Sequence, residues 1–189
     1  MFRHISAKFA LHTKRLFGVA ALRRLARRED GAATVEFALV AAPFLALLFA
    51  IIETALVFFA GQTLETATAD ASRLILTGQA QTQGFSQTQF KQSICSRVFG
   101  MFDCTNGIQI DVRTASSFSS TDLSKPIDSQ GNVNNNFVYQ PGNAGDIVVV
   151  RVMYQWPVWV SLMGLNLSDV TGNKRLLMAT AAFRNEPYQ

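Results

Sequence analysis

The side chains that could carry out chemistry are few and unevenly placed. Both histidines, His4 and His12, lie within the first 28 residues. A Ser-His-Asp or Cys-His arrangement therefore cannot be built from the rest of the chain, and no glycine-rich loop follows a strand to hold phosphate. A serine paired with Lys91, Lys125 or Lys174 remains an open alternative. The sequence favours a protein that is not an enzyme and has no cofactor.

The two cysteines, Cys95 and Cys104, are the other reactive groups. A bond between them would close a short loop and restrict the unfolded chain by roughly 2.5 to 3 kcal/mol. Disulfides are typical of oxidising compartments, so we expect the pair in a domain outside the cytoplasm. The alternative is two unpaired thiols, with Cys95 in a core. A metal site is disfavoured, because no further thiol is present and the histidines lie near the N-terminus.

A glycine and a glutamate lie where a basic segment meets an apolar one. Residues 1–28 carry eight Arg or Lys and no acid, whereas the remaining chain has more acidic than basic residues. Because basic residues stay on the cytoplasmic side of a membrane, we expect a cytoplasmic N-terminus. The charge is confined to one arm, which disfavours a nucleic-acid-binding face and leaves only a basic arm on nucleic acid as an alternative. The boundary segment Arg27–Phe37 reads RREDGAATVEF and contains Gly31 and Glu36.

The apolar run after this boundary is long enough to cross a bilayer. Phe37–Ile52 has no charge, and the apolar character resumes after Glu53 as far as Ala60. A helix of this length spans roughly 36 Å, which exceeds the hydrocarbon core. Pro43 is interpreted as a kink, which membrane helices tolerate. Glu53, at the outer end of the run, is expected to lie at the interface or in solvent.

The helix is expected to continue to about Gly78, because apolar residues recur at spacings of three and four. A short second helix over 90–99 is predicted to carry Cys95. Residues 114–145 are rich in Ser, Asn and Gly and predict a long surface loop.

Three segments predict strands. Gly107–Arg113 alternates, with Asp111 on its polar side, and is typical of a half-buried strand. Ile147–Tyr154 is apolar on both faces apart from one arginine, as in a central strand, and Lys174–Arg184 is the third strand. The predicted fold class is α+β, a long N-terminal helix packed on a small, mainly antiparallel sheet.

The segment Trp156–Leu167, WPVWVSLMGLNL, is too apolar for an ordinary solvated loop. Aromatic residues and Met are enriched in interface cores, so Trp156 and Trp159 form a candidate partner surface. The alternative is that this segment packs in the core of its own domain.

The boundary segment resembles the processing site of type IV prepilins. This resemblance implies that a membrane-embedded prepilin peptidase cuts between Gly31 and Ala32, which leaves Glu36 as the fifth residue of the mature chain. Glycine does not obstruct the scissile bond. A charged residue near mid-bilayer costs about 2.5 to 3.5 kcal/mol, so Glu36 needs a partner, and the new amine of a neighbouring subunit would serve.

Within that class, the opening GAATVEFALVAAPFLALLFAIIE and the ending AFRNEPY are similar to the TadE-like family, the minor pilins or pseudopilins of tight adherence (Flp, type IVb) pili. The resemblance implies a cleaved cytoplasmic leader over 1–31, a transmembrane helix over 32–60 and an exported α+β domain over 61–189. A major Flp pilin would be far shorter and would usually have tyrosine at the position of Phe37. TadG-like relatives carry an added domain.

The partners implied by this resemblance are the prepilin peptidase, other pilus subunits and pilus assembly proteins of the bacterial inner membrane. The C-terminus would lie in the periplasm, or outside the cell where the chain enters the fibre. An uncleaved, single-pass, membrane-anchored binding or scaffold module is the main alternative. A mitochondrially targeted protein would also have an Arg-rich N-terminus, but it leaves Gly31 and Glu36 unexplained.

Overall fold

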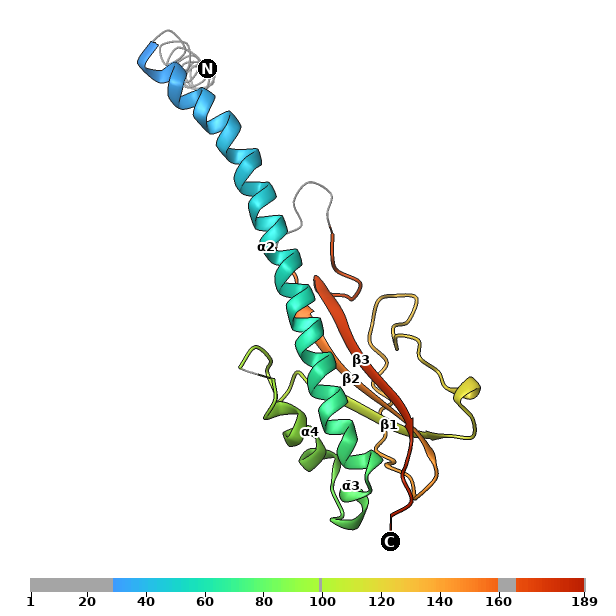
Figure 1. Cartoon of the computed structure of the whole chain (residues 1–189). Coiled ribbons are helices and arrows are strands. Elements are labelled where there is room, and N and C mark those ends of the chain that lie inside the picture. The colour runs from blue at the N-terminus through green and yellow to red at the C-terminus, as the bar shows by residue number, and fades with distance from the viewer. Residues whose placement is uncertain (1–28, 99, 160–165, 189) are drawn as a thin grey trace, which may run out of the picture. The chain divides into compact units, whose positions relative to one another are not determined.

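The computed structural model describes residues 29–98, 100–159 and 166–188. The chain divides into two compact units, one ending at Leu48 and the other running from Phe49 to Gln189. In chain order the elements are α2 (Glu29–Leu76), α3 (Gln79–Thr82), α4 (Gln87–Cys95), β1 (Gln109–Ala115), the 3₁₀ helix η1 (Phe118–Ser120), β2 (Ile147–Pro157) and β3 (Lys174–Arg184) (Figure 1).

The described part of the first unit is the apolar beginning of α2. Its large side chains are exposed in every direction around the helix; Phe37, Val40 and Phe44 are 74%, 71% and 62% exposed. The helix passes through Pro43 without ending. From Gly31 onward α2 is long and apolar enough to cross a membrane, and it is the single candidate span in the described part of the chain.

In the second unit, one face of α2 is buried. The stripe has the predicted spacing of three and four residues and consists of Val57, Ala60, Leu64, Ala67, Ala71 and Ile75. These residues share a hydrophobic core with side chains of all three strands, among them Val112, Val150 and Ala179. The helix ends at Leu76, close to the predicted end at Gly78.

The three strands form an antiparallel sheet in the order β1-β2-β3. Its register places Ile110 opposite Val152, and Val152 opposite Ala179. Residues opposite each other across antiparallel strands project from the same side of the sheet, so this row faces α2. The predicted α+β class, with a long helix on a small antiparallel sheet, is confirmed.

The segment between β1 and β2 covers the other face of the sheet. Met153, Val170 and Leu176 are buried there, with Ile127, Val133, Phe137 and Met178 packed against them. In Figure 1 this segment lies on the side of the sheet away from α2. It was expected to be a surface loop, but part of it forms a third layer. Asp111, expected on the solvent side of a half-buried strand, is therefore fully buried, and that expectation is wrong.

The short helix that carries Cys95 begins earlier than the pattern predicts. Its start at Gln87 follows a capping box, in which the Ser86 side chain accepts from the Gln89 backbone and the Gln89 side chain accepts from the Ser86 backbone. This pairing satisfies two helix-terminal groups and so sets the start of α4. Phe90 and Ile94 are its buried residues.

The C-terminal segment is hydrogen-bonded both to the end of α2 and to the loop before β2. The Glu186 N–H donates to the Leu76 carbonyl at 2.9 Å. The Asn185 side-chain amide donates to the carbonyls of Pro141 and Asn143 at 2.9 and 3.0 Å. The AFRNEPY ending therefore closes the second unit by satisfying backbone groups of two distant segments.

Gly78 lies where Tyr188 of the C-terminal segment packs against the end of α2. Its φ is +75°, a conformation that favours glycine, and a Cβ at this position would overlap the ring of Tyr188. We expect Gly78→Ala to destabilise the second unit by about 1–3 kcal/mol, through backbone strain and displacement of the ring. Urea unfolding of the full chain in detergent micelles would measure this loss.

Gly84→Ala is the matched control for Gly78→Ala. Gly84 also has a positive φ, +65°, but a Cβ there meets nothing within 4 Å. We expect it to lose less stability than Gly78→Ala because only the backbone is strained. Equal losses for the two variants would show that packing of Tyr188 on Gly78 contributes nothing.

Candidate functional site

The three residues of the predicted processing site lie close together at the start of α2. Gly31 and Ala32 fall in its first turn, and Glu36 follows about 6 Å further along the axis, at 1.5 Å per residue. Ala32 and Glu36 are exposed. Among the described residues Glu36 makes no hydrogen bond or ion pair. Within the part of the chain that the structure describes, this carboxylate therefore has no partner.

Glu53 lies in a different environment from Glu36. It is only 4% exposed, and its carboxylate Oε1 accepts a hydrogen bond from the Trp159 backbone N–H at 2.5 Å. The expectation that Glu53 faces solvent is wrong, because the chain after β2 covers its side chain. A buried carboxylate needs hydrogen bonds to offset its lost hydration, and Trp159 supplies one.

The two tryptophans of the candidate partner surface are placed differently. Trp156, at 7% exposure, belongs to the core, where its ring meets Phe102 edge-on at a centroid distance of 5.9 Å. The core alternative therefore holds for Trp156. Trp159 is 68% exposed and touches Trp156 edge-on at 6.3 Å. The remainder of the apolar segment, residues 160–165, lies outside the described residues.

Cys95 and Cys104 are bonded to each other in the structure. The Cα atoms are 5.8 Å apart, within the usual range for a disulfide. The bond joins the end of α4 to the turn that precedes β1, and both cysteines pack against the main core. It therefore links the end of the short helix covalently to the segment that leads into β1.

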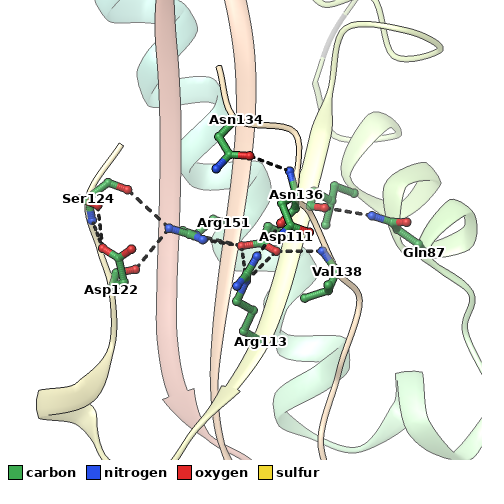
Figure 2. Close-up of polar contacts among 10 residues, drawn as sticks. Gln87, Asp111, Arg113, Asp122, Ser124, Asn134, Asn136, Val138 and Arg151 are labelled. Atoms are coloured by element: carbon green, nitrogen blue, oxygen red, sulfur yellow. Dashed lines mark hydrogen bonds and ion pairs between the residues drawn. The ribbon is translucent and has the colours of Figure 1, made fainter. Parts of the chain in front are cut away.

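A buried ionic cluster, which the sequence did not predict, lies on the sheet face away from α2 (Figure 2). Asp111 of β1 and Arg151 of β2 are opposite each other, and the Arg151 Nη2 lies 2.5 Å from the Asp111 Oδ2. Arg113 approaches the same carboxylate at 3.0 Å. The Asp111 side chain is 0% exposed and that of Arg151 only 8%.

This cluster also attaches the covering segment to the sheet. The Arg151 Nη1 donates to the carbonyls of Asp122 and Ser124, and the Val138 N–H donates to the Asp111 carboxylate at 2.9 Å. Figure 2 shows Arg151 reaching between the carboxylate on one side and the two carbonyls on the other. The buried charges are thus paired and hydrogen-bonded, as their burial requires.

The pKa of Asp111 reflects this environment. Burial alone would raise it, but the hydrogen bonds from the Val138 N–H, Arg151 and Arg113 outweigh burial and lower the pKa below its ordinary value of 3.8. The carboxylate is therefore held ionised. No group of three or more His, Cys, Asp or Glu among the described residues could hold a metal.

One signal in the sequence could have indicated the cluster. Arg151 is the only charge in the apolar run of β2, and a buried arginine requires an acidic partner. Asp111 is the only acid within β1, the neighbouring strand. The strand register that places them opposite each other was not available from the sequence pattern.

Comparison with known proteins finds a family to which the N-terminal part of the chain is similar. Residues 31–73 match the family described as TadE-like protein, which confirms the resemblance over the candidate membrane span and the buried stripe of α2. The TadE-like family consists of structural proteins associated with tight adherence (Tad) pili, so the match suggests an association of this chain with such pili. Neither a curated protein nor a solved structure matches the chain.

Proposed function

We propose that this chain is a minor pilin or pseudopilin of a tight adherence pilus, which helps to initiate or assemble the fibre. A prepilin peptidase removes residues 1–31, and residues 32–60 anchor the mature chain in the bacterial inner membrane. The N-terminus is cytoplasmic before cleavage, and the domain over 61–189 lies in the periplasm or enters the fibre with other subunits.

The observation that carries this proposal is the contrast between the two parts of α2. The first part exposes apolar side chains in every direction and a Glu36 that has no partner among the described residues, whereas the second part buries one face against a folded sheet. An apolar helix with a carboxylate that lacks an internal partner suits a subunit that packs against copies or relatives of itself. The TadE-like match covers this same helix.

An uncleaved anchored module would have the same fold, so processing separates the two functions. We expect Gly31→Trp to retain its leader, because the side chain obstructs the scissile bond, while the unchanged apolar helix still inserts. Pili should be lost, since eight positive charges would have to leave the cytoplasm with the subunit. The measurement combines N-terminal sequencing of the membrane-bound chain with surface pilus counts in a strain that lacks the native protein.

Ala38→Trp is the control for size, since it places the same side chain at an exposed position on the helix away from the scissile bond. Its N-terminus should still begin at Ala32. Normal piliation by Gly31→Trp with an intact leader would contradict the proposal and favour the uncleaved module.

A further inference from the structure

Exposed aromatic side chains occur around one short stretch of α2 in the second unit. Phe58 and Phe59 are 73% and 60% exposed, and Trp159, held beside Glu53 by its backbone, is 68% exposed. Trp156, the other tryptophan of this unit, is only 7% exposed. Exposure to water gives no physical reason for aromatic side chains at these three positions.

The position of Glu53 in the chain relates Trp159 to the proposed membrane span. Counting along the helix from Ala32 to Ile52 gives about 31 Å at 1.5 Å per residue, close to the 30 Å of a hydrocarbon core. Glu53 is the first charged residue after this run. The backbone bonded to Glu53 therefore belongs at the outer boundary of the bilayer, where tryptophan and other aromatic residues are enriched.

Burial of Glu53 makes this boundary suitable for lipid. An exposed carboxylate at this depth would have to keep its hydration or meet lipid phosphates of the same charge. Instead the chain after β2 covers the carboxylate, which accepts the Trp159 N–H, and the indole lies on the outside. An indole combines an apolar ring with one N–H donor, which suits the layer between acyl chains and headgroups.

We propose that Trp159 is a lipid contact of the folded domain, inserted into the outer interfacial layer of the bilayer that α2 crosses and positioned there by Glu53. This inference rests on the membrane anchoring in the proposed function, but it does not require cleavage or pilus assembly. The contact would fix the depth of α2 and hold the domain against the membrane before assembly.

Tryptophan fluorescence of the full chain in phosphatidylcholine vesicles tests the contact. Trp156→Phe leaves Trp159 as the single tryptophan. We expect its emission to be quenched more by lipids brominated near the headgroup than by lipids brominated near the acyl end. Iodide, present on both sides of the bilayer, should quench it less than a tryptophan at an aqueous position.

Three variants provide the controls. Phe118→Trp, made in a chain with both native tryptophans replaced by Phe, reports an exposed position in η1 and should respond to iodide alone. In the Trp156→Phe chain, Glu53→Ala should increase iodide quenching of Trp159 and decrease quenching by lipid. Glu65→Ala, at an exposed position on the same helix, should change neither.

The outcomes separate this inference from the proposed function. Chains that float with the vesicles while iodide quenches Trp159 as strongly as the tryptophan at 118 would overturn the lipid contact and leave the anchoring intact. Quenching by neither reagent would mean that protein covers the indole, which also overturns it. Chains that fail to float would refute the anchoring itself.

Discussion

Asp111→Ala is expected to destabilise the second unit by about 3 to 5 kcal/mol, because it leaves Arg151 buried without its carboxylate. The variant also removes the acceptor for the Val138 N–H, which attaches the covering segment to the sheet. Both effects act on the same face, so the third layer should loosen first. Urea unfolding of the full chain in micelles, followed by tryptophan emission, would measure the loss.

Two comparisons show whether the loss comes from the uncompensated charge. Asp70→Ala removes an exposed carboxylate of α2 and should change stability little. Replacing Asp111 with Leu and Arg151 with Met together removes both buried charges, and should cost less than Asp111→Ala alone. A loss below about 1 kcal/mol for Asp111→Ala would show that the cluster is not a determinant of the fold.

The same cluster predicts the response of the fold to acid. Because the pKa of Asp111 is lowered in the folded chain, its contribution to stability is fully present above the ordinary value of 3.8. It is lost as the pH falls through the lower, folded pKa. Asp111→Ala should therefore narrow the stability difference between neutral and acidic solution.

Periodicity was sufficient to predict the helix and the sheet. The buried stripe of α2 recurs at helical spacing, and β3 spans the Lys174–Arg184 segment that the sequence indicates. Periodicity predicts these elements because each one buries a face against a neighbour. The buried face places apolar residues at a regular spacing, which is characteristic of a helix or of a strand. The candidate membrane span is equally visible, since a helix in lipid requires apolar side chains on all sides.

Polar residues whose partners lie far away in the chain could not be placed in this way. Glu53 is separated from Trp159 by 106 positions, and Asp111 from Arg151 by 40. An acid in an alternating strand is expected to face solvent, and here that expectation fails because a segment without its own periodicity folds over the sheet. Periodicity in the sequence predicts which residues are buried between helices and strands. It does not predict which residues are buried under an irregular segment.

The two glutamates of α2 lead to opposite expectations for assembly and stability. Glu36→Gln should leave the unfolding midpoint of the second unit unchanged, since Glu36 lies in the first unit and has no partner among the described residues. Incorporation into pili should fall to near zero, because the amine at Ala32 of a neighbouring subunit loses its counter-charge in a medium where an unpaired charge costs about 2.5 to 3.5 kcal/mol.

Glu53→Ala is the matched comparison, because it removes a carboxylate from the same helix that accepts a hydrogen bond from the Trp159 backbone N–H. It should lower the unfolding midpoint of the second unit, since the Trp159 N–H loses its acceptor. Leader removal, unfolding and surface pili are measured for both variants in parallel. If Glu36→Gln assembles normally while its leader is removed, the amine needs no carboxylate from Glu36, and the helix packs into the fibre through apolar contacts alone.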